Sequence, residues 1–167
     1  PRELEHQLKD SGSKAIVIIE NFATTLQSCI ANTPVKHVVL CAMGDQLGFL
    51  KGMLVNYVVR NVKKLVPEYS LPGAVRFNDA IAKGQRGTFK PVDIKPDDIA
   101  LLQYTGGTTG VSKGAVLLHR NVIANVLQAE AWNEPVMKSL PAGEQPTSIC
   151  ALPPYHIFAF TVNMMLG

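Results

Sequence analysis

The chain has 167 residues, of which 47% are apolar and 17% charged, so it has enough apolar material for a folded core and is not a disordered segment. A net charge of only +3, without any run of lysines and arginines, argues against a nucleic-acid-binding protein. Three cysteines without a C-x-x-C pair and four scattered histidines argue against a disulfide framework and a metal site, and no apolar stretch reaches the roughly 18 residues of a membrane span. This cysteine usage suits a reducing compartment, so we expect a cytoplasmic protein.

The two ends of the chain indicate a piece of a longer protein. The sequence opens with PRELEH, without an initiator methionine or a signal-peptide pattern, and it stops inside the apolar run TVNMMLG.

The first 42 residues contain two strand patterns around a helical one. KAIVIIE (14–20) is a short β-branched run that predicts a buried strand, and the run at 37–42 predicts a second. Residues 21–32 have apolar side chains at helical spacing, with Asn21 as the expected N-cap. Strand, helix and strand at this spacing predict a βαβ unit and a parallel sheet.

Residues 45–66 predict the longest helix, although two glycines weaken it. Its apolar residues share one face: Leu47, Leu50, Leu54, Val58, Val62 and Leu65. Basic residues fall on roughly the opposite side: Arg60, Lys63 and Lys64. One hypothesis is a surface helix that docks on the protein's own core, and the other is peripheral contact with an anionic membrane at the inner face of the cell.

The remainder continues the α/β alternation. After a proline-punctuated segment with one short helix, IALLQYT (99–105) predicts a strand and residues 115–132 a helix. Residues 147–153 predict a further strand, and a helical segment begins at Pro154. The predicted fold is therefore α/β, with βαβ units in a mostly parallel sheet flanked by helices.

Between the strand at 99–105 and the helix after it stands YTGGTTGVSKGA, a stretch of small residues with one lysine. Its members are Tyr104, Thr105, Gly106, Gly107, Thr108, Thr109, Gly110, Val111, Ser112, Lys113, Gly114 and Ala115. Glycines let backbone N–H groups approach oxygen atoms, threonine hydroxyls add donors, and lysine supplies a positive charge, so the loop predicts a phosphate site. A plain flexible turn is the alternative.

Two common phosphate motifs do not fit this loop. The Walker pattern G-x-x-x-x-G-K-[ST] starts well at Gly107, but it places Ser112 where a glycine is needed and Gly114 where the magnesium ligand is needed. The dinucleotide fingerprint G-x-G-x-x-G has no match in the loop.

The stretch YTGGTTGVSKG resembles the phosphate-binding signature of the adenylate-forming (AMP-binding) enzymes. With LLQYTGGTTG, LLHRNVIAN, LPPYHIFAFT and the segment that starts MGDQLGFLKG, the chain is similar to bacterial long-chain fatty acyl-CoA ligases over nearly its whole length. Ser112 departs from the usual proline or alanine, a change that we expect to have little consequence. The resemblance implies a fragment of the large N-terminal domain, with residues 1–90 as its first α/β portion and 91–167 as the portion that carries the loop.

The resemblance also implies a two-step reaction. A fatty carboxylate attacks the α-phosphorus of ATP to give acyl-adenylate and pyrophosphate, and the thiol of CoA then displaces AMP, with Mg²⁺ as cofactor. The loop would offset the charge on the phosphates, with Thr109 and Lys113 most directly involved in catalysis, the hydroxyls of Thr105 and Thr108 as donors, and backbone N–H groups around the glycines.

The segment PPYHIF supplies a second candidate site. In the family the matching segment lies near the acyl carboxylate, so Tyr155, His156 and Phe158 are the implied substrate residues. An isolated histidine beside apolar residues is more often a packing or capping residue. His119 is interpreted as part of the helix after the loop, with Arg120 on its surface.

The family's adenine-site motif, ribose-binding aspartate, hinge and small C-terminal domain have no counterpart in these 167 residues. The isolated chain is therefore expected to form no acyl-CoA. Alternatives are a stand-alone nucleotide- or phosphate-binding module, an enzyme for another carboxylic acid, and a structural α/β piece whose sheet edge pairs with a second copy as a homodimer.

Overall fold

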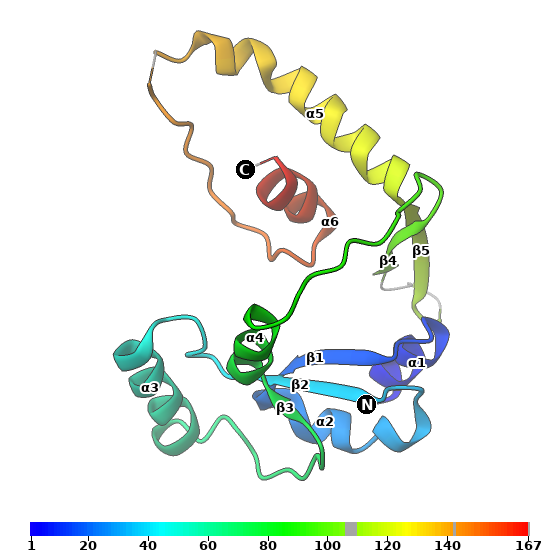
Figure 1. Cartoon of the computed structure of the whole chain (residues 1–167), viewed down its shortest axis with the longest axis vertical. Helices are drawn as coiled ribbons and strands as arrows, with labels where there is room; N and C mark the ends of the chain where they lie inside the picture. Colours follow the sequence, from blue (N-terminus) through cyan, green and yellow to red (C-terminus); the bar gives the residue numbers. More distant parts are fainter. Residues whose placement is uncertain (106–109, 142, 167) are drawn as a thin grey trace. The chain divides into compact units, whose positions relative to one another are not determined.

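The computed structural model describes residues 1–105, 110–141 and 143–166. It consists of two compact units, one formed by residues 1–91 with 110–112 and the other by residues 92–105 with those from 113 onward. Helices and strands alternate along the chain, as Figure 1 shows, so the predicted α/β class is confirmed.

The first unit is built on a parallel sheet of three strands in the order β1–β2–β3 (Figure 1). These are β1 (Ala15–Ile19), β2 (His37–Cys41) and the short β3 (Val75–Arg76). The register places Ala15 opposite His37 and Ile19 opposite Cys41. The two strands predicted from β-branched runs are therefore confirmed, together with their parallel pairing.

The connection from β1 to β2 is more broken than the single helix predicted at 21–32. It consists of η1 (Glu20–Phe22), α2 (Ala23–Gln27) and η2 (Ile30–Asn32). Asn21 is not an N-cap; its side-chain amide instead donates to the carbonyl oxygen of Leu65 at 3.1 Å. That contact ties this connection to the β2–β3 crossover at Leu65, beyond the end of its helical part at Val62.

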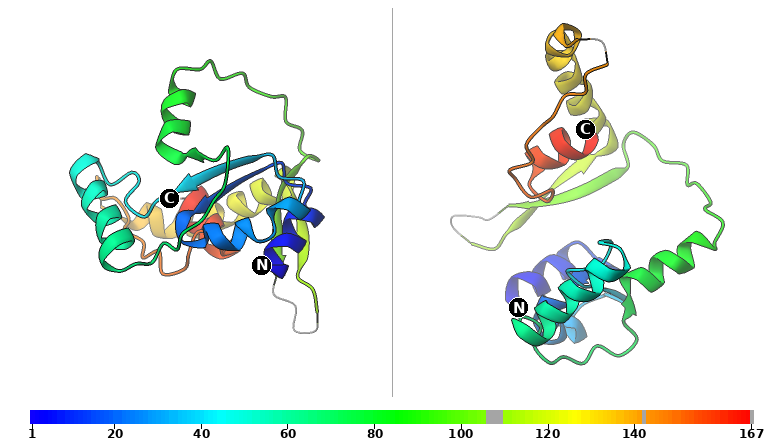
Figure 2. Two further views of the ribbon diagram at one scale, coloured as in Figure 1. Left: turned by 90° about the horizontal axis from the view of Figure 1, so that it is seen from below. Right: turned by 90° about the vertical axis from the view of Figure 1, so that its left-hand side faces the viewer.

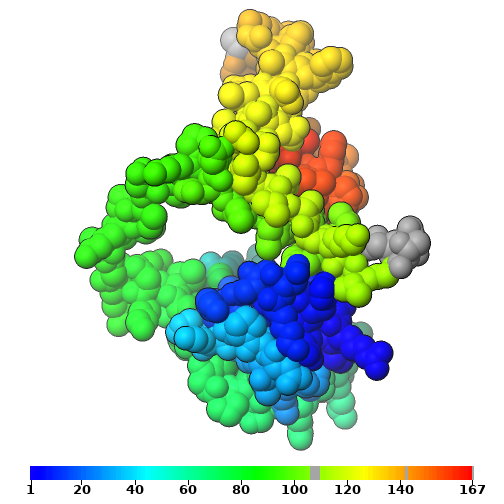
Figure 3. Space-filling view, turned by 90° about the vertical axis from the view of Figure 1, so that its right-hand side faces the viewer, coloured from blue at the N-terminus to red at the C-terminus, as the bar shows by residue number. Residues whose placement is uncertain are grey.

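The core of the first unit is small. Helix α1 (Arg2–Asp10) contributes to it, and α4 (Phe77–Gln85) follows β3. Its buried apolar residues are Leu8, Ala23, Leu26, Cys29, Leu40 and Ala42. Figure 3 shows the blue and light-blue residues of this part of the unit closely packed.

The β2–β3 crossover contains α3 (Phe49–Tyr57), which continues as a π-helical segment, η3 (Val58–Val62). The predicted helix at 45–66 therefore exists over a shorter range, because the chain turns before it: Gln46 has a φ of +69° and Gly48 one of +79°. Those values lie in the left-handed region, so the helix cannot extend back through them.

The second unit begins with an antiparallel pair, β4 (Ile99–Thr105) and β5 (Lys113–Leu118), shown in Figure 2. The strand predicted at 99–105 is confirmed, but the prediction that the helix starts at 115 is wrong. Residues up to Leu118 complete the hairpin, and α5 (His119–Ser139) follows. The first turn of α5 is held by Asn121, whose Oδ1 accepts from the N–H of Leu118 at 2.9 Å.

The strand predicted at 147–153 is also wrong. Those residues are irregular, and they lead to α6 (Ile157–Ala159) and the π-helical η4 (Phe160–Met165). None of the helices in the described ranges is long and apolar enough to cross a membrane.

Candidate functional site

The predicted phosphate loop joins two antiparallel strands, where a strand and a helix were expected. The register of β4 and β5 pairs Thr105 with Lys113 and Tyr104 with Gly114. Directly opposed residues have Cβ atoms about 4.5–5.5 Å apart, so the hydroxyl of Thr105 and the Lys113 side chain start from neighbouring points at the entry to the loop. Both residues are exposed.

Four predicted members of the loop, Gly106, Gly107, Thr108 and Thr109, lie outside the described residues. The proposed part of Thr109 in catalysis therefore remains a prediction from the sequence. The described flank is exposed at Gly110 and Val111, and Lys113 forms no ion pair with any described residue.

Gly114 is a glycine because an aromatic ring lies against it. A Cβ added there would stand 3.0–3.3 Å from atoms of the Tyr104 ring on the opposite strand. Such distances are shorter than ordinary van der Waals contact, so a side chain at 114 would displace the ring. The sequence predicted Tyr104 and Gly114 as members of the phosphate loop, and the structure shows that they pack against each other at the base of the hairpin. The next residue, Ala115, pairs with Gln103.

Ser112 is buried, with 8% of its surface exposed. Its carbonyl oxygen accepts from Nε2 of His6 at 3.0 Å, and its hydroxyl oxygen accepts from the amide of Gln7 at 3.4 Å. Since a carbonyl oxygen only accepts, the hydrogen lies on Nε2 of His6. The residue that departs from the family signature is thus held by two side chains of α1, a contact that the sequence pattern did not predict.

The second candidate segment lies beside strand β4. The carbonyl oxygen of Tyr155 accepts from the Gln103 side chain at 3.4 Å, and Gln103 directly precedes Tyr104 of the loop. His156 caps α6, because its Nδ1 accepts from the N–H of Phe158 at 3.3 Å. The tyrosine ring and His156 are exposed. His156 therefore acts as a helix cap, as expected of an isolated histidine, and its ring remains accessible to solvent.

A groove of about 610 Å³ lies between α5 and the α6–η4 segment. It is lined by Leu117, Asn121, Val122, Asn125, Ala129, Ile157, Phe158, Phe160, Thr161 and Val162. Phe158 is the only one of the three predicted substrate residues that lines it. The spacing of Val122, Asn125 and Ala129 along α5 was a signal for one shared face, but periodicity alone did not indicate an open groove.

The loop stems do not provide a metal site of their own. Residues 99–105 and 110–118 contain no carboxylate, and Mg²⁺ in proteins is usually held by one or two carboxylates with substrate phosphates. Among the described residues there is no group of three His, Cys, Asp or Glu side chains that could hold a metal ion.

Comparison with known proteins gives consistent matches. A family model described as AMP-binding enzyme matches residues 1–167. The chain is 52% identical to the long-chain-fatty-acid–CoA ligase of Escherichia coli O157:H7 and 53% identical to that of Haemophilus influenzae, over 166 residues in each case. These matches cover 99% of this chain and 29% of each relative, so the chain spans less than a third of their length. It is 31% identical to 4-coumarate–CoA ligase 2 of Oryza sativa over 159 residues, 95% of this chain and 25% of that one.

Two solved structures share the fold. The crystal structure of an anthranilate CoA ligase in complex with anthranoyl-AMP matches 80% of this chain and 20% of its own, with a TM-score of 0.54 and 24% identity. The adenylation domain of a carboxylate reductase from Mycobacterium chelonae matches 76% of this chain and 19% of its own, with a TM-score of 0.50 and 20% identity.

Proposed function

Because the chain belongs to the AMP-binding enzyme family, we propose that the protein containing it is an ATP-dependent acid–thiol ligase for long-chain fatty acids. It would activate the fatty acid as acyl-adenylate and transfer the acyl group to CoA. The observation that carries this proposal is the 52–53% identity to bacterial long-chain-fatty-acid–CoA ligases across 99% of the chain, which includes the whole loop and the Tyr155–Phe158 segment.

The loop would hold the phosphates of ATP during the first step. Attack of the carboxylate on the α-phosphorus breaks the bond to pyrophosphate, so negative charge grows on the leaving oxygen. Lys113 would offset that charge, and the opposed hydroxyl of Thr105 would donate to a phosphate oxygen from the other strand. The predicted donors Thr108 and Thr109 would complete the set. These contacts would position the phosphates and offset their negative charge, and they would transfer no proton.

The groove beside α6 would take part of the acyl chain. Its lining is mostly apolar, with Phe158 and Phe160 on one side and Val122 on the other, which suits a methylene chain and not a charged ligand. Tyr155 and His156 stand just before the groove-lining residues, next to strand β4, which suits a carboxylate at that end.

Mg²⁺ does not fit the described loop residues as a protein-held ion, because they offer hydroxyls and an ammonium but no carboxylate. A magnesium requirement thus stays a proposal for the whole enzyme. We likewise propose CoA as the acyl acceptor, a cytoplasmic location with contact to the inner face of the cell membrane, and formation of a homodimer.

The test uses the full-length protein with ATP, CoA and palmitate, and follows AMP and palmitoyl-CoA. We expect both products in equal amounts, and none from the isolated 167-residue chain. Butyrate, 4-coumarate and anthranilate serve as competing acids. If the protein uses one of these acids in preference to palmitate, that acid replaces the long-chain fatty acid as the proposed substrate. If it forms an adenylate from none of the four acids, the proposed reaction is wrong.

A further inference from the structure

Helix α1 is anchored on the first unit at two points. Leu8 is buried in the core of that unit, with 7% of its surface exposed. The carboxylate of Glu5 accepts from the side-chain amide of Asn32, in η2, at 3.3 Å. His6 and Gln7 lie between these two anchors and are half-buried. Their side chains therefore start from a helical backbone that is held on both sides.

The contact of His6 with Ser112 fixes the peptide group next to Lys113. Nε2 of His6 donates to the carbonyl oxygen of Ser112 at 3.0 Å, and Ser112 is buried. That carbonyl and the N–H of Lys113 belong to one planar peptide unit, so the direction of one sets the direction of the other. His6 therefore holds the peptide group from which the backbone of Lys113 starts.

Strand β4 holds Lys113 from the other side. Strand β5 begins at Lys113, and Thr105 and Lys113 form the last described pair of the hairpin. The pairing supports this residue along β5, and His6 supplies a second support on the side of the loop. Loss of the His6 bond would take a donor away from the carbonyl of a buried residue, which costs free energy. The peptide would then turn, and the backbone of Lys113 would follow it.

We propose that His6 is a positioning residue for the phosphate loop, which acts through the carbonyl of Ser112 to direct Lys113 toward the phosphates of ATP. This inference rests on the proposed function, because it concerns how Lys113 would offset the charge on the leaving pyrophosphate. That charge grows in the transition state, so a misdirected lysine lowers the rate more than it weakens the binding of ATP. His6 needs no contact with ATP for this role and transfers no proton.

The first experiment measures pyrophosphate release by the full-length protein with ATP and palmitate. His6→Phe fills the space of the ring without a donor, His6→Asn carries its amide on a stem too short to reach Ser112, and His6→Gln carries a donor at nearly the reach of Nε2. We expect kcat to fall about tenfold in His6→Phe and His6→Asn, the fold-change that corresponds to one hydrogen bond, with the KM for ATP changed less than about twofold. His6→Gln should restore kcat to within about threefold of the wild type. His37→Phe is the matched control, since His37 is exposed at the start of β2, and it should leave release unchanged.

A double-mutant cycle tests whether His6 acts through Lys113. In the Lys113→Ala background, His6→Asn should lower the residual release by less than about twofold, because the side chain that it positions is gone. A histidine with a merely structural role would lower release by the same factor in both backgrounds. That result would overturn the proposal.

Hydrogen exchange of a peptide that covers residues 110–118 gives a readout that needs no reaction. We expect exchange on the order of tenfold faster in His6→Asn than in the wild type, and wild-type exchange in His6→Gln. Unchanged exchange in His6→Asn overturns the proposal, as does normal pyrophosphate release in both His6→Phe and His6→Asn while the wild type is active. Either result leaves the proposed reaction standing. Absence of release from the wild type with any of the four acids overturns the proposed reaction and, with it, the part of His6.

Discussion

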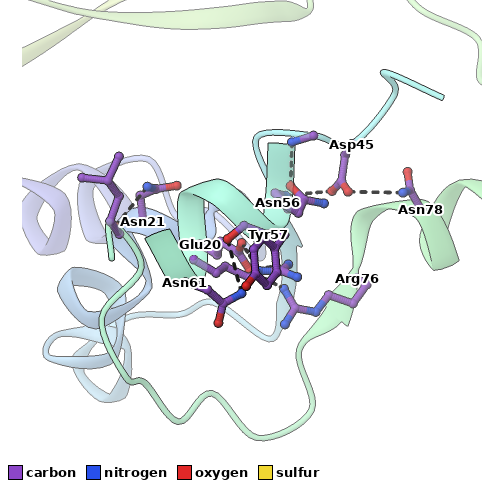
Figure 4. A network of polar contacts seen from close by, with 12 residues as sticks. Glu20, Asn21, Asp45, Asn56, Tyr57, Asn61, Arg76 and Asn78 are labelled. Atoms are coloured by element: carbon purple, nitrogen blue, oxygen red, sulfur yellow. Dashed lines mark hydrogen bonds and ion pairs between the residues drawn. The ribbon is translucent and has the colours of Figure 1, made fainter. Parts of the chain in front are cut away.

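Glu20 follows strand β1 directly, with 1% of its surface exposed, and its carboxylate is shared by two arginines. Arg60 donates to both oxygens, and Arg76 donates to Oε2 at 2.8 Å (Figure 4). The three bonds join the end of β1 to the β2–β3 crossover and to β3. We predict that Glu20→Gln loosens all three segments together, because it removes the charge and leaves two guanidinium groups facing an amide.

The size of the effect follows from the exposure of the partners. Hydrogen bonds to a charged group are each worth about 1.5–3 kcal/mol, and breaking a fully buried pair costs about 3–5 kcal/mol. Arg60 and Arg76 are 39% and 50% exposed, so water replaces part of what they lose. We therefore expect a loss of about 2–4 kcal/mol. If opening of the first unit limits exchange, about 3 kcal/mol corresponds to roughly 100-fold faster amide exchange.

Hydrogen exchange of the full-length protein, read by mass spectrometry on peptides that contain β1, η3 and β3, measures this effect. Glu68→Gln is the matched control, since it makes the same chemical change at an exposed glutamate near the same arginines and should alter exchange less than twofold. Equal exchange in Glu20→Gln and in the wild type would refute the reasoning, as would acceleration confined to η3.

The pH dependence of the Glu20 contribution has a definite sign. Burial raises the pKa of Glu20, but hydrogen bonds from Arg60 and Arg76 outweigh it, so the pKa lies below its ordinary value of 4.5. A carboxyl with a lowered pKa stabilises the folded state fully above the unfolded value and loses that contribution as the pH falls through the folded value. The difference between wild type and Glu20→Gln should thus be constant from pH 8 to 5.5 and shrink only below about 4.5.

Three further predictions concern single side chains. Gly52→Ala should destabilise the protein by 2 kcal/mol or more in urea unfolding, because its Cβ would lie 2.5 Å from a backbone oxygen, whereas Gly84→Ala, with open space around its Cβ, should gain about 0.5–1 kcal/mol. Lys113→Ala should lower the rate of pyrophosphate release at least 100-fold, and Lys90→Ala should not change it; near-normal release in Lys113→Ala would remove that lysine from the site. Asn121→Ala should cost about 1 kcal/mol by thermal unfolding through loss of a cap at 2.9 Å, and an unchanged midpoint would contradict that assignment.

The sequence predicted strands well where a β-branched run had a partner strand. β1, β2 and β4 lie within one residue of the ranges expected from their runs. The run at 147–153 has similar local composition but forms no strand. A strand exists only when its N–H and C=O groups find another strand, and local composition does not reveal whether such a neighbour is present.

The same limit applies to the candidate site. The glycines, threonines and lysine of the loop indicated phosphate, but KGAVLL (113–118) suits a strand and a helix about equally by periodicity. Residues 113–118 form a strand because they pair with β4. The same pairing places Thr105 opposite Lys113 and the Tyr104 ring against Gly114. The contact of Ser112 with α1 joins residues more than 100 positions apart, so no local pattern could have predicted it.

For helix α3, the periodicity of the sequence shows which residues share a face but not whether that face is buried. The spacing of Leu50 and Leu54 correctly indicated a shared apolar face, but the hypothesis that this face docks on the protein's own core is wrong within the described first unit, where both residues are exposed. Gly52 packs against the unit instead, because a helix approaches a backbone most closely where it has no side chain. Gly52, which lowers the expected stability of the helix, thus determines which face of α3 packs on the first unit. Leu50 and Leu54 lie on the opposite, exposed face.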